Sequence, residues 1–191
     1  FDVIISSAVI SNETINLLSQ YNARFCITHT GDFNNDNSKW YTSCREHKIE
    51  FISESKQQSQ ILENNKFKVT TITPPCDEYL LSNVVNKGKS DRKNLLMVGS
   101  IQYRKNQLRA VKIFHELKKS SSKFDKLFLV GNIVLDEHYK ELIAYINSNK
   151  LTNYIHLTGF QKHYYKYYSL SFCCISTSRS EGFATSNREA M

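Results

Sequence analysis

The chain has 191 residues, with 25 Lys or Arg against 18 Asp or Glu, and its formal net charge is +7. Hydrophobic residues make up 40% of it and aromatic residues 12%, which excludes a disordered chain, and no apolar run reaches the length of a membrane span. The positive charge is compatible with a nucleic acid, an anionic membrane surface or a phosphate-bearing ligand as partner.

The first part of the chain alternates short apolar runs with helical stretches. The runs predict strands at 2–9, 23–28, 50–53 and 68–72, and the stretches predict helices at 13–20, 39–46 and 54–64. Strands that alternate with helices predict parallel βαβ architecture. A polar, charged segment, NKGKSDRK at 86–93, then predicts a linker between two domains.

The second part repeats this alternation as a Rossmann-like half. We expect strands at 95–99, 127–131, 154–159 and 172–176, helices at 107–119, 136–149 and 163–169, and a last helix that begins near Asn187. A helix cut at Met191 cannot stand alone, and the chain starts at Phe1 without Met. We therefore expect a segment of a longer protein, truncated at both ends.

Five cysteines stand at 26, 44, 76, 173 and 174. They are odd in number and form no C-x-x-C pair, and adjacent cysteines have poor geometry for a bridge or a zinc site. We expect free thiols in a reducing compartment and no structural metal.

The loop after the strand at 95–99 reads GSIQYRKN. Gly99 lets the backbone approach a ligand, while Arg104 and Lys105 place two cations beside a helix N-terminus. These are the two features that phosphate binding needs. An ordinary basic loop would have the same residues, and the loop alone does not decide between the two interpretations.

The loop after the strand at 172–176 carries two carboxylates, Glu181 and Glu189, with seven residues between them. A carboxylate can accept hydrogen bonds from both hydroxyls of a ribose diol, so Glu189 could bind a nucleotide. The pattern Ser186-x-x-Glu189 is also a capping box, in which Glu189 would only cap its own helix.

The order VGS…RKN, LFLVGN, YIHLTGF and SRSEGFATSNREAM resembles the donor-binding domain of GT-B glycosyltransferases. It is most similar to the large retaining family 4 (glycosyl transferases group 1), whose hallmark is this E-x7-E run. The resemblance implies an α/β GT-B fold of two Rossmann-like domains with parallel sheets. Residues 1–85 would be the C-terminal part of the acceptor-side domain, 86–93 the linker and 94–191 an incomplete donor-binding domain.

The first part matches the family less closely. The segment Pro74-Pro75-Cys76-Asp77 stands where the family usually reads Pro-Asn-Gly-Val-Asp, and Ser100 stands where many members have Arg. These departures leave open a second hypothesis, a non-catalytic GT-B-like binding or scaffold subunit.

The resemblance implies donor-binding residues in both loops and in the turn after 154–159: Gly99, Ser100, Arg104, Lys105, Phe160, Gln161, Gly182, Phe183, Thr185, Ser186 and Glu189. Lys105, with Arg104 beside it, would hold the donor diphosphate, and Glu189 would bind the ribose. Phe160 and Gln161 would lie beside the base.

The remaining implied roles concern the sugar and the diphosphate. Glu181 would stabilise the transferred sugar electrostatically, backbone N–H groups of Gly182 and Phe183 would contact it, and Thr185 and Ser186 would face the diphosphate. The acceptor-domain His29 would contact the donor sugar, so the catalytic set is Glu181, His29 and Lys105.

The implied reaction is retaining transfer from a UDP- or GDP-sugar to a glycan or lipid-linked acceptor, in polysaccharide or cell-surface glycan biosynthesis. No metal is required and no cofactor is permanently bound. We expect a cytoplasmic protein, compatible with a peripheral position at the inner face of the membrane. A third hypothesis is a basic nucleic-acid-binding α/β domain that uses the run YYKYY at 164–168, although this run fits a short helix with half its tyrosines packed inward better, and no nucleic acid is expected.

Overall fold

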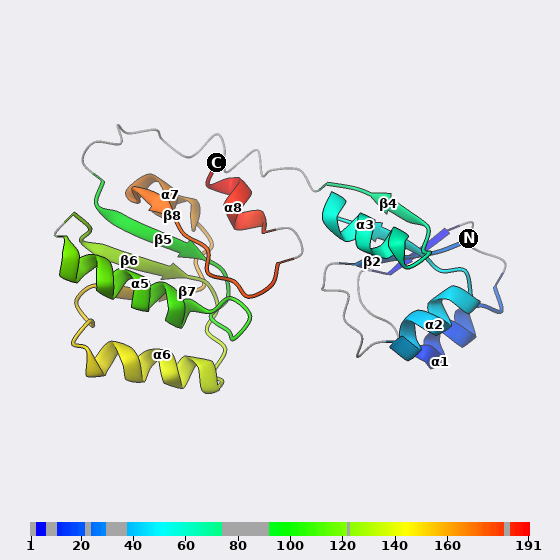
Figure 1. Cartoon of the computed structure of the whole chain (residues 1–191), viewed down its shortest axis with the longest axis horizontal. Helices are drawn as coiled ribbons and strands as arrows, with labels where there is room; N and C mark the ends of the chain where they lie inside the picture. Colours follow the sequence, from blue (N-terminus) through cyan, green and yellow to red (C-terminus); the bar gives the residue numbers. More distant parts are fainter. Residues whose placement is uncertain are drawn as a thin grey trace. The chain divides into compact units, whose positions relative to one another are not determined.

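The computed structural model describes residues 3–6, 11–21, 24–29, 38–73, 92–121, 123–181 and 184–191. These form two compact units, Phe1–Pro75 with Glu181–Phe183, and Cys76–Ser180 with Ala184–Met191. Each unit holds one four-stranded parallel sheet (Figure 1), which confirms the expected α/β class. Of the predicted linker at 86–93, all but the last two residues lie outside the described residues.

The first sheet has the order β1-β2-β3-β4, so each strand joins beside its predecessor in the chain. Its elements are β1 (Val3–Ser6), α1 (Asn12–Leu18), β2 (Arg24–His29), α2 (Ser38–Glu46), β3 (Glu50–Ser53), α3 (Lys56–Asn64) and β4 (Val69–Thr71). They agree with the predicted elements to within about two residues at most ends. Parts of the strand predicted at 2–9 lie outside the described residues.

Aromatic side chains fill the core of this first unit. The rings of Tyr41, Phe51 and Phe67 are buried and contact one another, with the Phe51 and Phe67 centroids 4.8 Å apart in an edge-to-face arrangement. Trp40 packs against the same group. Because such rings bury large apolar areas, these few residues join α2 to β3.

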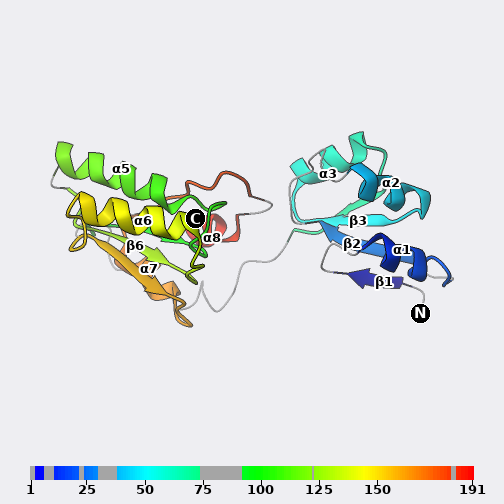
Figure 2. The same ribbon diagram turned by 90° about the horizontal axis from the view of Figure 1, so that it is seen from below.

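The second sheet has the order β7-β6-β5-β8. Its elements are β5 (Asn94–Val98), α5 (Gln107–Ser120), β6 (Lys126–Val130), α6 (Glu137–Ser148), β7 (Ile155–Gly159), α7 (Tyr165–Leu170), β8 (Cys173–Cys174) and α8 (Thr185–Glu189). Figure 1 and the perpendicular view in Figure 2 show α5 and α6 on one face of this sheet and α7 on the other.

The side chains of β5 alternate between these two faces. Leu95 and Met97 belong to the core beneath α5 and α6, whereas Leu96 packs with Val130 and Tyr168 under α7. Successive side chains of a strand point to opposite faces. A continuous apolar run such as NLLMV is therefore typical of a parallel strand covered on both faces.

Two predicted elements differ from the observed ones. The strand predicted at 172–176 has only Cys173–Cys174 as ladder residues, because β8 is an edge strand whose single neighbour is β5. The last helix begins at Thr185, not near Asn187 as predicted, since Ala184 is its N-cap in the left-handed conformation, with φ 48°.

Four cysteines among the described residues, at 26, 44, 173 and 174, are free thiols as expected, while Cys76 lies outside the described residues. Of the helices that the structure describes, none has both the length and the apolar character needed to cross a membrane.

A close backbone approach joins the ends of β5 and β6. A Cβ atom added to Gly131 would lie 2.3 Å from the carbonyl oxygen of Gly99, and Gly131 has a φ of +154°. Gly131 also donates its N–H to the Gly159 carbonyl at 3.1 Å. No side chain fits at Gly131 unless the backbone after β5 moves.

We predict that Gly131→Ala lowers the free energy of unfolding of the second unit by about 3 kcal/mol, because the added methyl overlaps backbone atoms. Gly159→Ala is the matched control, since Gly159 has a φ of +67° but open space around the Cβ position. It should lose only the roughly 1–2 kcal/mol of left-handed strain. Native-state hydrogen exchange of the β5 and β6 amides measures both, and equal losses would contradict the account.

Candidate active site

The strand order of the second sheet places the two predicted loops side by side. The chain runs outward from β5 to β6 and β7, then returns to the other side of β5 as β8. The order thus reverses between β5 and β8. In open α/β sheets, ligands bind beyond the carboxyl ends of the strands at such a switch point, which is where 99–106 and 175–184 begin.

Hydrogen bonds join these two loops. The Thr177 hydroxyl donates to the Asn106 carbonyl at 2.8 Å. The Arg179 N–H donates to the Arg104 carbonyl at 2.8 Å, and the Arg104 guanidinium donates back to the Ser180 carbonyl at 3.0 Å. The loops therefore form one structure, with Arg104 bracing the second loop.

Gln107 holds the first loop in shape from beneath. Its side chain is only 1% exposed. Its Nε2 donates to the Ser100 carbonyl at 2.9 Å and to the Gly99 carbonyl at 3.4 Å, while its Oε1 accepts the Gln102 N–H at 3.3 Å. From the sequence, we predicted Gln107 only as the first residue of a helix. One signal in the sequence could have indicated its bracing role. Gln107 is a polar residue at the first position of a helix, directly after a loop rich in candidate ligand groups.

Lys105 lies across the Gly99 backbone. A Cβ atom at Gly99, whose φ is +147°, would lie 3.4 Å from Cε and 3.5 Å from Cδ of Lys105. The aliphatic stem of Lys105 thus packs over Gly99 at ordinary contact distance. That Lys105 and Arg104 bind a diphosphate stays a prediction.

Two tyrosines hold the carboxylate of Glu189. The Tyr164 hydroxyl donates to Oε1 at 2.8 Å, and the Tyr168 hydroxyl lies 2.9 Å from Oε2. The interpretation of Ser186-x-x-Glu189 as a capping box is wrong, because the N-cap of α8 is Ala184 and Ser186 lies inside the helix. Burial and the Glu189 carboxylate raise the pKa of Tyr168 above the ordinary 10.0, so this phenol keeps its proton.

The run YYKYY therefore packs partly inward, as expected. Tyr164 and Tyr168 turn to Glu189, and the ring of Tyr167 contacts Phe128 with centroids 5.3 Å apart.

The other predicted site residues lie outside this network of hydrogen bonds between the two loops, or their contacts are only partly described. Phe160 follows β7 and is 70% exposed, and the Gln161 amide donates to the Thr158 carbonyl at 2.9 Å. Thr185 is exposed, whereas Ser186 and Glu181 are half-buried. Gly182 and Phe183 lie outside the described residues, and of His29, the last residue of β2, only the backbone is described.

One aromatic side chain of the joined loops contacts both a cation and a histidine. The Arg179 guanidinium lies 4.2 Å from the centroid of the Tyr103 ring, in cation–π geometry. The Tyr103 ring in turn meets His138 edge to face at 6.4 Å. His138 is 5% exposed, and its Nε2 has no hydrogen-bond partner among the described residues.

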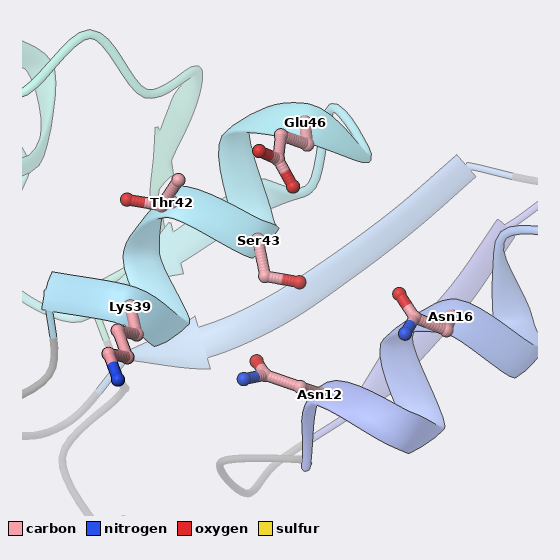
Figure 3. A pocket seen from close by; sticks show the side chains of 6 residues that line it. All are labelled: Asn12, Asn16, Lys39, Thr42, Ser43 and Glu46. Atoms are coloured by element: carbon pink, nitrogen blue, oxygen red, sulfur yellow. The ribbon is translucent and has the colours of Figure 1, made fainter.

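Two further features do not coincide with the predicted site. Within the described ranges, no group of three or more His, Cys, Asp or Glu could hold a metal ion. In the first unit, an open groove of about 400 Å³ lies between α1 and α2 (Figure 3). Polar and charged side chains line it: Asn12, Asn16, Lys39, Thr42, Ser43 and Glu46. Its one lysine and one glutamate balance in charge, so the groove does not favour an anion.

The family model "Glycosyl transferases group 1" matches residues 82–191, which include both joined loops. No curated protein matches the chain in sequence.

Solved structures match the fold over nearly the whole chain. A glycosyltransferase from Rickettsia africae ESF-5 shares 21% identity over 93% of this chain and 51% of its own, with a TM-score of 0.69. Anabaena HepE in complex with UDP and glucose shares 15% identity over 100% and 56%, with a TM-score of 0.77. An S. aureus TarM variant in complex with Fondaparinux, alpha-GlcNAc-glycerol and UDP shares 18% over 88% and 35%, with a TM-score of 0.69. The chain thus spans about half the length of the first two and about a third of TarM, and its fold is GT-B.

We predict that Gln107→Leu lowers the free energy of unfolding of the second unit by about 1–3 kcal/mol, because it leaves the Ser100 carbonyl and the Gln102 N–H without their partner. Scanning calorimetry measures it. The transition that Trp40 fluorescence does not follow belongs to the second unit, since the one Trp lies in α2. The exposed Gln60→Leu is the control and should shift neither transition notably. A Gln107 variant as stable as the wild type would refute the bracing role.

We also predict that His138 makes the second unit sensitive to acid. Burial first, and the positive charge of Arg179 to a smaller degree, lower the pKa of His138 below 6.5, against the opposing Asp136 and Glu141. His138 therefore binds a proton more readily in the unfolded chain than in the folded unit. The free energy of unfolding falls as the pH drops below about 6.5.

Calorimetry between pH 7.5 and 5 tests this for the wild type and His138→Gln. The variant should lose less stability on acidification than the wild type, whatever its stability at neutral pH. Parallel pH profiles would contradict the prediction.

Proposed function

Because the chain belongs to the glycosyl transferases group 1 family, we propose that it is the donor-binding part of a retaining glycosyltransferase, with a portion of the acceptor-side domain. The donor is a nucleoside-diphosphate sugar, and the acceptor is a glycan or a lipid-linked glycan. Three structures of HepE contain UDP, UDP with glucose, or UDP-glucose, which supports UDP as the first nucleotide to test, with GDP as the alternative.

One observation carries the proposal: the loops after β5 and β8 are bonded together at the switch point of the second sheet. In this proposal, the first loop and the helix after the second loop each supply one charged group to a nucleotide. Lys105 supplies a cation from the first loop, and Glu189 supplies a carboxylate after the second. A diphosphate and a ribose are the adjoining parts of a nucleotide that suit these two charges.

The diphosphate is bound by Lys105 together with Arg104, Ser100, Thr185 and Ser186. A leaving nucleoside diphosphate gains negative charge as the sugar C1–O bond breaks, and fixed cations and hydrogen-bond donors stabilise charge where it develops. This chemistry calls for no metal.

The transfer step forms a bond between the acceptor oxygen and C1 on the face that the leaving phosphate occupied. The acceptor proton passes to the leaving phosphate oxygen, so no protein carboxylate need bond to the sugar. Glu181 stabilises the positive charge that develops on the sugar ring, and Gly182, Phe183 and His29 contact the sugar. Phe160 and Gln161 lie beside the base.

The proposed reaction also suits a cytoplasmic protein. Free thiols at four cysteines suit the reducing cytoplasm, where nucleotide sugars are substrates. A lipid-linked acceptor in polysaccharide or cell-surface glycan synthesis would bring the enzyme to the inner face of the membrane.

We predict that Lys105→Ala weakens nucleoside-diphosphate binding by about 10-fold or more, since a hydrogen bond to a charged group contributes about 1.5–3 kcal/mol. Glu189→Ala should weaken it similarly. Isothermal calorimetry of UDP, GDP and their sugars with the full-length protein measures this. Lys126→Ala is the matched control, because Lys126 is exposed at the start of β6, and the site loops follow the opposite, carboxyl ends of the parallel strands.

If neither Lys105→Ala nor Glu189→Ala weakens a nucleotide that the wild type binds, the site assignment is wrong. Donor binding with neither sugar transfer nor donor hydrolysis would instead favour a non-catalytic GT-B-like subunit. A salt-dependent shift of labelled RNA, without nucleotide binding, would favour a nucleic-acid-binding domain.

A further inference from the structure

Tyr164 and Tyr168 lie beneath the carboxylate that the proposed function assigns to the ribose. Tyr164 is the N-cap of α7, and Tyr168 is one turn further along, so the two side chains lie on the same face. Their rings meet edge to face with centroids 6.2 Å apart. This pair of side chains, which we call the tyrosine pair, is contributed by the run YYKYY.

Each hydroxyl of the tyrosine pair contacts a different carboxylate oxygen of Glu189. Tyr164 donates to Oε1 at 2.8 Å. The Tyr168 hydroxyl lies 2.9 Å from Oε2 and 3.1 Å from the Ser186 carbonyl, and a charged acceptor forms the stronger bond. With both oxygens held, the carboxylate cannot turn about its terminal bond.

Rigid packing fixes the hydroxyls themselves. Tyr168 is 8% exposed and its ring lies in the small core with Leu96 and Val130. These two residues belong to β5 and β6, the two central strands of the sheet. Glu189, by contrast, lies at the end of α8, a helix of five residues. The tyrosine pair therefore ties a carboxylate on a short helix to the central strands of the sheet.

The hydrogen-bond capacity of Glu189 fits a second pair of donors. An ionised carboxylate has about four lone-pair positions, and the tyrosine pair uses two. Since no further donor to Glu189 lies among the described residues, two positions remain, one on each oxygen, and they match the two hydroxyls of a vicinal diol. We propose that Tyr164 and Tyr168 are positioning residues that aim Glu189 at the ribose diol and so make the site select ribonucleotides over 2′-deoxyribonucleotides.

This inference rests on the proposed function, because it takes Glu189 as the ribose ligand. The test is calorimetry of the full-length protein with UDP and 2′-deoxy-UDP, and with GDP and 2′-deoxy-GDP. It compares the wild type, Tyr164→Phe/Tyr168→Phe, Glu189→Gln, and Tyr167→Phe as the control on the same helix, whose ring contacts Phe128. Each change to Phe keeps the ring and removes only the hydroxyl.

We expect the wild type to bind the ribonucleotide about 10-fold or more tightly than its 2′-deoxy counterpart. The double tyrosine variant should bind the ribonucleotide about 5- to 20-fold more weakly and the deoxynucleotide within about twofold, so that the ratio falls toward one. Tyr167→Phe should keep the ratio. In a Glu189→Gln background, the tyrosine changes should alter the ratio no further.

If the double tyrosine variant bound both nucleotides more weakly to the same degree, or bound both as the wild type does, the affinity ratio would not change. Either result would overturn this inference alone, because the tyrosine pair would then only support the fold. A wild type that binds nucleotides without discrimination overturns the ribose role of Glu189, and this inference with it. A wild type that binds no nucleotide overturns the proposed function as well. Calorimetric unfolding of each variant separates these outcomes from loss of the fold.

Discussion

The hydrogen bond between the Thr177 hydroxyl and the Asn106 carbonyl joins residues 71 positions apart in the chain. Together with the bonds between Arg104 and the second loop, this hydrogen bond joins the two loops into one continuous structure. The strand order brings the loops to the same end of the sheet, and these bonds hold them in register. A cation from one loop and a carboxylate following the other can then serve a single ligand.

The backbone around the joined loops has little freedom. Gly131 lies so close to the Gly99 carbonyl that no side chain fits, and Gln107 is bonded to the backbone at Ser100 and Gln102. Below Glu189, the tyrosine pair performs the same task with side chains. Preorganisation of this kind matters for a site whose chemistry depends on stabilising charge, because groups already in place need no reorganisation during the reaction.

Most of the fold could be predicted from the sequence. Strands such as β5 and β6 are continuous apolar runs because both faces of a parallel sheet are covered, and α5 shows its buried face through Ala110, Val111 and Phe114. The start of α8 could not be predicted, since nothing in Ala184 itself indicates a left-handed N-cap. The family resemblance correctly indicated the GT-B fold.

The candidate site was only partly predictable. The sequence singled out the loops after β5 and β8, because ligand groups gather after strands of a parallel sheet, and the structure joins these two loops. The capping-box alternative for Glu189 was wrong, since that pattern is local, whereas Tyr164 and Tyr168 reach the carboxylate from 25 and 21 residues away. The role of Gln107 was missed for a similar reason. Such contacts depend on how α7 and the loops pack on the sheet, which spacing along the chain does not encode.

In the proposed function, a nucleoside diphosphate binds where the loops after β5 and β8 meet. Hydrogen-exchange mass spectrometry of the full-length protein, with and without saturating UDP or GDP, tests it most directly. We expect protection on binding to concentrate in peptides that span residues 99–107 and 176–190, with little change in α6. Protection confined to other parts of the second unit, with these peptides unchanged, would contradict it.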